Sequence, residues 1–337
     1  MGASGTGDAG LVERDAARQA LAKARADAAL GRGRTVLAYG EAGIGKTSLL
    51  RAAFGPPAHP AAWRVLWGGC DALFSPRPLG PLFDMAAQLG AHVRAMLVRE
   101  GQRSELFAAL LEQLRSSMSP TALVFEDVHW ADAATLDCIK FIGRRVEGVK
   151  ALLVLSYRDD ELDQRHPLRA VLGDLPAPQT VRIPLAPLTE AGVAELARRH
   201  GTMRHGLFES TRGNPFFVVE SLRGDALPAT VRDSVLARAA RLRPSVRSVL
   251  DFVAIVPTRS EAALLEAVVG PSTDDLAAAV HSGLLLADGA HIRFRHELAR
   301  IAVEQALSSP AAMSLHASAL GGRTWRALVV LLSVVAW

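Results

Sequence analysis

Two segments of the 337-residue sequence carry side chains whose types and spacing suit the binding of a phosphate and a metal ion. The first is GEAGIGKT, residues 40–47, and the second is VFEDVHWAD, residues 124–132. In the second segment, Glu126 and Asp127 are adjacent carboxylates at the end of an apolar run. Two like charges repel, so the holding of a cation is one reason for such a pair. A solvated strand end is the alternative interpretation.

The segment GEAGIGKT matches the phosphate-binding loop pattern GxxxxGK[ST] without a gap, between an expected strand and an expected helix. Its glycines would let the backbone turn so that successive N–H groups point at phosphate oxygens, aided by the positive end of the helix dipole. Lys46 would reach the β- and γ-phosphates, and the Thr47 hydroxyl would ligate Mg²⁺. A glycine-rich turn that matches by chance is the alternative. The residues expected to contact nucleotide here are Gly40, Glu41, Ala42, Gly43, Ile44, Gly45, Lys46, Thr47 and Ser48.

A bound nucleoside triphosphate with Mg²⁺ would also explain the adjacent carboxylates. An acid at the end of a neighbouring strand can hold the metal, usually through water, and a second acid can polarise the attacking water. We assign Glu126 to the metal and Asp127 to catalysis or sensing, and the reverse order stays open. The metal and the triphosphate would offset the repulsion of the pair. The expected metal ligands are therefore Thr47, Glu126 and Asp127, and the expected catalytic residues include Lys46, Glu126 and Asp127.

Strands that alternate with helices must position these residues. Apolar runs predict strands at TVLAY, RVLWGG, ALVF, ALLVLSY and VRIPL, which are residues 35–39, 64–69, 122–125, 151–157 and 181–185. Helical patterns occupy residues 11–30, 47–54, 82–98, 104–117, 133–145 and 191–199. This alternation predicts an α/β fold, with a parallel sheet of the P-loop NTPase type covered by helices on both faces.

The pattern after about Thr189 is helical. The run GLLLADGAHIRFRH, residues 283–296, then predicts a hairpin that turns at Asp288-Gly289, and the helix ELARIAVEQAL follows it. Helices followed by a two-stranded wing indicate a winged-helix domain. We expect a flexible leader at residues 1–10 and a P-loop ATPase domain at residues 11–188. A small helical lid at residues 189–240 and a winged helix at residues 241–308 would follow. Residues 309–337 would be the start of a further helical region with an apolar tail.

Composition excludes several classes of protein. Half of the residues are hydrophobic, which is enough for a sizeable core and two or more domains. The net charge of +4 is spread along the chain without a Lys/Arg-rich block, so nucleic-acid binding is not indicated. Cys70 and Cys138 lack metal-ligand spacing, which argues against a zinc site or a disulfide framework and fits a reducing cytoplasm. We expect no membrane span, because the apolar run WRALVVLLSVVAW is shorter than a membrane helix needs.

Five motifs in this order, GEAGIGKT, EDVHWAD, LSYRDDEL, GNPFFVVE and FRHELAR, resemble those of a known family. The chain, from about Leu11 to about Leu320, resembles the STAND class of signal-transduction ATPases. Within that class it is similar to the AAA-type ATPase module of large LuxR-type bacterial transcriptional regulators. The resemblance implies an ATP/ADP switch that ATP opens and ADP holds shut, with slow Mg²⁺-dependent hydrolysis. Self-association on activation is compatible with that class.

The resemblance also implies roles for individual residues. Arg158 is similar to the sensor arginine that detects the γ-phosphate, although an arginine at a strand end can be a surface residue. Pro215 resembles the proline that packs near the adenine, or it simply begins a helix after an Asn cap. His296 resembles the histidine that approaches the β-phosphate of ADP, or it caps a turn between wing and helix. Val12 and Arg14 resemble a segment beside the base.

Three further residues match the family's HWAD block without a role that physics assigns. We expect the Trp130 ring to pack and Asp132 to cap the next helix, and we do not assign His129 to catalysis.

The sequence also departs from the family pattern. Such regulators continue through helical repeats to a helix-turn-helix domain, whereas this sequence stops at Trp337. We expect the tail to come from a truncated or frameshifted reading frame, and a short membrane-touching or partner-binding helix is the alternative. DNA binding is not expected from this chain alone. One alternative is a compact regulator that binds DNA through the winged helix, and another is a non-functional remnant. The arginines that could contact DNA in the first alternative are Arg232, Arg238, Arg241, Arg243 and Arg247.

Overall fold

The computed structural model describes residues 11–55, 63–71, 77–98, 103–202, 204–223, 227–256 and 259–321. The chain divides into two compact units, residues 1–186 and residues 187–337, and each is described by itself.

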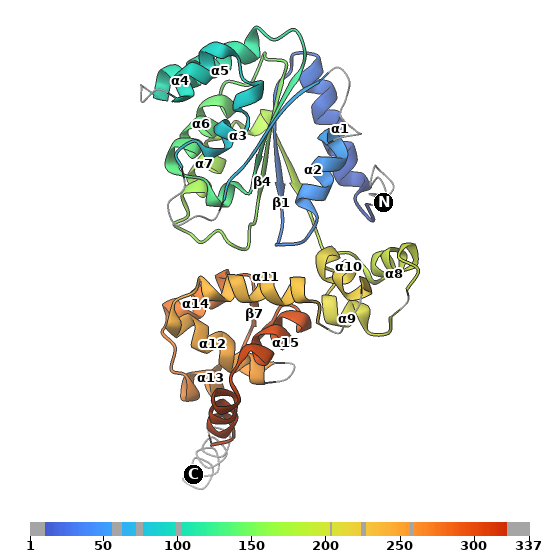
Figure 1. The fold of residues 1–337 in the computed structure, drawn as a ribbon, viewed down its shortest axis with the longest axis vertical. Coiled ribbons are helices and arrows are strands. Elements are labelled where there is room, and N and C mark those ends of the chain that lie inside the picture. The colour runs from blue at the N-terminus through green and yellow to red at the C-terminus, as the bar shows by residue number, and fades with distance from the viewer. Residues whose placement is uncertain are drawn as a thin grey trace. The chain divides into compact units, whose positions relative to one another are not determined.

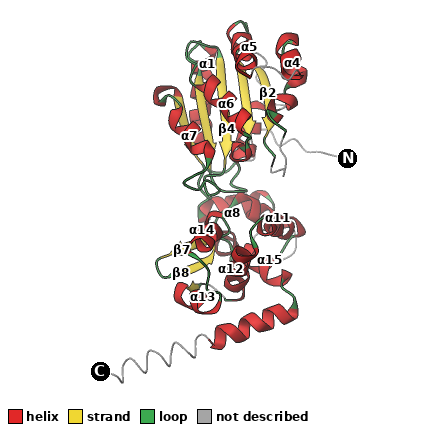
Figure 2. Cartoon of the chain, turned by 90° about the vertical axis from the view of Figure 1, so that its left-hand side faces the viewer, coloured by secondary structure: helices red, strands yellow, loops and turns green. Residues whose placement is uncertain are grey.

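The first unit is built on a parallel sheet, drawn in yellow in Figure 2. The sheet has five strands in the order β2-β3-β4-β1-β5. The strands are β1 (Arg34–Tyr39), β2 (Arg64–Gly69), β3 (Thr121–Glu126), β4 (Ala151–Tyr157) and β5 (Thr180–Pro184). Every residue of β4 is buried, as expected for a strand that helices cover on both faces. The predicted α/β fold with a parallel sheet is confirmed.

Helices cover both faces of this sheet (Figure 1). On one face, α1 (Asp15–Ala29) and α2 (Lys46–Phe54) pack Leu21 and Leu50 into a core that includes Val36 and Val154. The other face carries a larger core around Leu37, Leu123 and Leu155. The helices there are α3 (Gly80–Asp84), α4 (Ala91–Val98), α5 (Arg103–Arg115), α6 (Ala133–Gly143) and α7 (Pro167–Asp174). Short 3-10 turns are η1 (Ala86–Gln88), η2 (Val128–Trp130) and η3 (Ala177–Gln179).

The helices of the first unit differ from the sequence prediction in two places. Residues 82–98 form three short pieces instead of one helix, because Leu89 is extended and the N–H of Gly90 donates to the Gln113 side chain at 2.8 Å. The helix α7 was not predicted. It begins at a proline, and the preceding His166 accepts a hydrogen bond from the N–H of Leu168 at 3.2 Å.

The second unit is mainly helical and has its own buried core, which runs from Phe217 to Ala319. Its helices are α8 (Glu190–Arg199), α9 (Leu207–Thr211), α10 (Pro215–Arg223), α11 (Ala229–Ala240), α12 (Pro244–Ile255), α13 (Ala262–Val268), α14 (Thr273–His281) and α15 (Glu297–Ala306). Residues 309–321 are also helical.

The predicted hairpin is present in the second unit. Strand β7 (Leu285–Asp288) pairs antiparallel with β8 (His291–Phe294), so Gly289 and Ala290 form the turn. A third strand, β6 (Ser260–Glu261), pairs with the other edge of β8. Its two residues are too few to show a strand pattern in the sequence.

None of the helices in the described parts of the chain is long and apolar enough to cross a membrane. The leader at residues 1–10 and the apolar tail from residue 322 onward lie outside the described residues.

Candidate functional site

The loop GEAGIGKT connects β1 to α2, as the sequence predicted. Three of its glycines have positive φ angles, 148° at Gly40, 74° at Gly43 and 100° at Gly45, which L side chains adopt only with strain. A Cβ atom on Gly40 would also lie 2.6 Å from the Leu185 carbonyl oxygen. The α2 helix begins without a side-chain cap, so its N-terminal N–H groups are suited to an anion.

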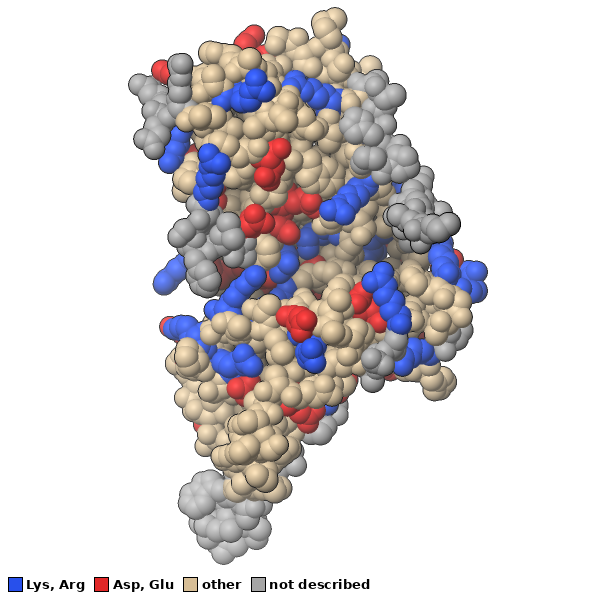
Figure 3. Space-filling model, in the orientation of Figure 1, with Lys and Arg blue, Asp and Glu red and all other residues tan. Residues whose placement is uncertain are grey.

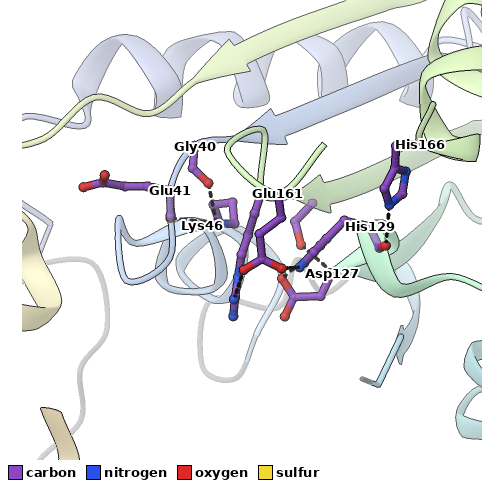
Figure 4. A network of polar contacts seen from close by, with 9 residues as sticks. Gly40, Glu41, Lys46, Asp127, His129, Glu161 and His166 are labelled. Carbon is purple, nitrogen blue, oxygen red and sulfur yellow. Dashed lines mark hydrogen bonds and ion pairs between the residues drawn. The ribbon is translucent and has the colours of Figure 1, made fainter. Parts of the chain in front are cut away.

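Lys46 is buried at the first position of α2. Its Nζ donates hydrogen bonds to the carbonyl oxygens of Gly40 at 2.7 Å and Glu41 at 2.9 Å (Figure 4). Burial and, to a smaller extent, the charge of Arg158 lower the pKa of Lys46 to about 8, while Asp127 opposes the shift. The ammonium group is therefore an incompletely solvated cation, which a phosphate can stabilise better than water does.

The two adjacent carboxylates have different surroundings. Glu126, the last residue of β3, accepts a hydrogen bond from the Trp67 indole at 2.8 Å through one oxygen. Its other oxygen is buried without a hydrogen-bond partner among the described residues. Asp127 has a left-handed backbone with φ at 52°, and the Ser156 hydroxyl accepts the hydrogen bond of its N–H at 3.0 Å.

The strand order corrects one expectation about the carboxylates. Strand β4 lies between β1 and β3, so Glu126 and Asp127 do not follow a strand next to the loop strand. The strand next to β1 is β4, and Arg158 follows it directly. The error arose because the order of strands in the sequence does not fix their order in a sheet.

A cluster of polar side chains lies beside the loop, and it includes Glu161, which the sequence analysis missed. Arg158 pairs with Glu161 at 2.5 Å between Nη1 and Oε1. The other oxygen of Glu161 lies 3.4 Å from Nε2 of His129, and Nδ1 of His129 lies 3.9 Å from Oδ1 of Asp127. Figure 4 shows Asp127, His129 and Glu161 grouped next to Lys46. Glu161 lies within the motif LSYRDDEL, but no spacing rule points to it.

The expectations for Trp130 and Asp132 are confirmed. Asp132 caps α6, because its side chain accepts hydrogen bonds from the N–H groups of Ala134 and Thr135. The Trp130 ring packs against the core and lies 4.8 Å from the Arg158 guanidinium.

Arg14 holds the phosphate loop from the N-terminal side. Its guanidinium is buried and donates to the carbonyl oxygens of Ile44 at 3.1 Å and Ala186 at 2.9 Å. Burial lowers the pKa of Arg14. Val12 is also buried. Whether this segment lies beside a base stays a prediction.

Pro215 and His296 belong to the second unit. Pro215 begins α10, and the Asn214 side chain accepts a hydrogen bond from the N–H of Phe216 at 3.1 Å. His296 is buried, donates through Nδ1 to the Thr211 carbonyl oxygen at 3.0 Å and packs against the Phe217 ring. The Asn214 contact agrees with the structural alternative for Pro215. The His296 side chain makes no capping hydrogen bond to α15, so the alternative that it caps the turn before this helix is wrong. Contact with nucleotide stays a prediction for both residues.

The described residues suit a magnesium ion that binds together with a nucleotide. No group of three or more His, Cys, Asp or Glu side chains in the described ranges could hold a metal by itself. Mg²⁺ in such sites is held by one or two protein oxygens together with phosphate oxygens and water. Thr47, which follows Lys46 on α2, and the buried unpartnered oxygen of Glu126 are suitable donors of this kind.

Residues 10–155 match a family model described as the AAA ATPase domain. This part of the chain is therefore similar to an AAA ATPase domain. The match covers the loop, α2 and the Glu126-Asp127 pair, and it stops before Arg158. The AAA ATPase domain thus accounts for the two segments that the sequence analysis selected first.

Solved structures are similar to this chain, and the first of the three described here shares its fold. The Walker-type ATPase paby2304 of Pyrococcus abyssi is 13% identical with a TM-score of 0.63, over 89% of this chain and 98% of that chain. A STAND protein with a tetratricopeptide repeat sensor from Pyrococcus horikoshii is 16% identical with a TM-score of 0.45, over 94% of this chain and 46% of that chain. The Orc1 protein of Aeropyrum pernix, solved with DNA, is 16% identical with a TM-score of 0.49, over 90% of this chain and 94% of that chain. No curated protein matches the chain.

Proposed function

We propose that this protein is an ATP/ADP-binding switch module that hydrolyses ATP slowly with Mg²⁺. The observation that carries the proposal is the buried Lys46 ammonium at the start of α2, beside Asp127 and Arg158. A triphosphate would bind the loop N–H groups and Lys46, and its terminal phosphate would be close to a cation and an acid on two further strands.

The proposal gives each site residue a role. Thr47 and Glu126 would hold Mg²⁺, which polarises the phosphoryl group. Asp127 would orient the attacking water, and Arg158 would stabilise charge on the transferred phosphoryl group. Asp127 can also act as a metal ligand through water. Slow turnover would suit a switch, which needs a long-lived nucleotide state.

The second unit would close over the nucleotide in this proposal. Residues 189–240 would form the lid and residues 241–308 a winged helix, with Pro215 near the adenine and His296 near the β-phosphate of ADP. The hairpin of β7 and β8 followed by α15 is compatible with a wing. We place the chain in a signal-transduction ATPase of the STAND type, as part of a LuxR-like regulator.

The structure does not favour DNA binding by the arginines of the second unit. Arg232, Arg243 and Arg247 pair with Asp233, Asp275 and Asp251, so their charge is partly neutralised. On the face of this unit shown in Figure 3, basic and acidic side chains are interspersed. A phosphate backbone is bound by basic surfaces that lack such neutralisation.

The proposal is tested first on the purified chain. The protein is denatured, and any released nucleotide is identified by chromatography with its molar ratio; binding of Mg-ATP and Mg-ADP and phosphate release are then measured on the emptied protein. We expect near-stoichiometric ADP and slow phosphate release. A chain that releases no nucleotide and binds neither would contradict the proposal and favour a non-functional remnant.

Replacement of Lys46 by Ala should lower nucleotide affinity at least 100-fold, because it removes a charge-assisted contact to two phosphates. Lys23→Ala, on an exposed position of α1, is the control with the same change of charge. Calorimetric titration with Mg-ATP measures both variants. Unchanged binding by Lys46→Ala, with the fold intact by circular dichroism, would refute the site.

A further inference from the structure

The guanidinium of Arg158 is already engaged by an anion of the chain itself. Its Nη1 donates to Oε1 of Glu161 at 2.5 Å, and both side chains are only 19% exposed. The guanidinium also lies 4.8 Å from the centroid of the Trp130 ring, which restricts it further. Charge-assisted hydrogen bonds of this kind are among the strongest in proteins.

Glu161 has a second neighbour besides Arg158. Its second oxygen lies 3.4 Å from Nε2 of His129, whose side chain is 1% exposed. The carbonyl oxygen of His129 in turn accepts a hydrogen bond from Nε2 of His166 at 3.0 Å. Arg169 of α7 holds the segment after Glu161 by donating to the carbonyl oxygens of Leu162 at 2.7 Å and Asp163 at 2.6 Å. The backbone that follows Glu161 is therefore anchored by Arg169.

Arg158 is close enough to the phosphate loop for its charge to lower the pKa of Lys46. A terminal phosphate beside Lys46 would bring a second anion to the same guanidinium. The hydrogen bond to Glu161 uses Nη1 of Arg158, and paired hydrogen bonds to a phosphate would draw on the same guanidinium, so the two anions would compete for it.

We propose that Glu161 is a latch that competes with the γ-phosphate for Arg158 and thereby weakens the binding of ATP relative to that of ADP. ADP lacks the γ-phosphate, so it binds while the Arg158–Glu161 pair stays intact. ATP must break the pair before it gains the contact with Arg158. This inference deepens the proposed function and rests on it, and it concerns a residue to which that function gives no role.

The test measures the ratio of two affinities. Dissociation constants for Mg-ADP and for the non-hydrolysable β,γ-methylene analogue of Mg-ATP are determined by calorimetry on the emptied full-length chain. Glu161→Gln keeps the size of the side chain and removes its charge. We expect it to bind the ATP analogue about tenfold more tightly, the size of one lost charge-assisted hydrogen bond, with ADP affinity changed less than about twofold.

Two control variants isolate the Arg158–Glu161 pair. Asp163→Asn removes a negative charge from an exposed position two residues away and should leave the ratio unchanged. In an Arg158→Ala background, Glu161→Gln should have no effect, because no guanidinium remains for either anion. If Glu161→Gln does not fold, Glu161→Asp serves instead: it keeps the charge, shortens the reach to Arg158, and should shift the ratio in the same direction.

The possible outcomes separate the latch from the nucleotide site. Weaker binding of the ATP analogue by Glu161→Gln would overturn the latch, because Glu161 would then orient Arg158 toward phosphate. An unchanged ratio, or an equal change for both nucleotides, would also overturn it. In these cases the proposed function stands if Lys46→Ala still abolishes binding. A wild-type chain that binds neither nucleotide would overturn both.

Discussion

Lys46 and the two cysteines show how burial acts on single residues. Burial lowers the pKa of Lys46 because it disfavours the charged ammonium, and it raises the pKa of each thiol because it disfavours the thiolate. Of these three residues, only Lys46 lies in the candidate nucleotide site. Cys70 and Cys138 are packed in the core of the first unit, where their sulfur atoms act as small apolar groups.

The cysteines should be unreactive in the folded chain. Burial raises the pKa of both thiols to about 12, so little thiolate forms at pH 8. We expect iodoacetamide at pH 8 to modify neither cysteine in the native protein and both in guanidinium, as read by mass spectrometry. Rapid modification of the native chain would show that the core around Cys138 opens. The unfolded thiols ionise near their ordinary pKa, so stability should fall as the pH rises above about 9.

At the scale of elements, the ends of β1, β3 and β4 form the site together with α2. Each strand end supplies one part: β1 leads into the phosphate loop, β3 supplies Glu126 and Asp127, and β4 supplies Arg158. The helix α6 is capped by Asp132, whose Oδ2 also accepts a hydrogen bond from the N–H of Leu79 at 3.2 Å. One carboxylate thus joins the turn after β3 to the start of α3.

Removal of the α6 cap should lower stability without removing the nucleotide contacts. Asp132→Ala leaves N–H groups of α6 and Leu79 unsatisfied, so we expect the free energy of unfolding to fall by about 1–2 kcal/mol. Asp137→Ala, at an exposed position inside the same helix, is the matched control and should change it by less than about 0.5 kcal/mol. Urea denaturation followed by circular dichroism measures both. Equal effects would show that the cap contributes nothing specific.

At the scale of the whole molecule, the two units have separate cores. The cores on the two faces of the sheet contain residues up to Leu185, and the core of the second unit begins at Phe217. Each unit therefore buries apolar side chains without help from the other, which is the usual condition for folding alone.

A fragment of residues 1–186 should fold by itself. We expect a cooperative thermal transition, because both faces of the sheet keep their helices and Arg14 keeps both of its carbonyl partners. The fragment should still bind Mg-ATP through Lys46, more weakly than the full chain if Pro215 and His296 contact nucleotide. Differential scanning calorimetry and titration with Mg-ATP test these statements. A fragment without a cooperative transition would show that the first unit depends on the second.

The sequence by itself determined the local parts of this protein. Glycine spacing, an apolar run before a helix and a Lys-Thr pair are short-range signals. They were enough to predict the phosphate loop of residues 40–47 and the strands that precede this loop and the Glu126-Asp127 pair. The Asp288-Gly289 pair gave the hairpin in the same way. The prediction of one helix over residues 82–98 was wrong, because the helix is interrupted where the N–H of Gly90 donates to the Gln113 side chain of α5.

Only the tertiary structure decided the order of the strands and which polar side chains lie next to one another. It inserts β4 between β1 and β3, and it brings Glu161 and His129 against Arg158 and Asp127. The physical reason is that these contacts join residues on different elements, whose approach depends on how the sheet is packed. No short-range pattern records that packing, so the Arg158–Glu161 pair could be found only in the folded chain.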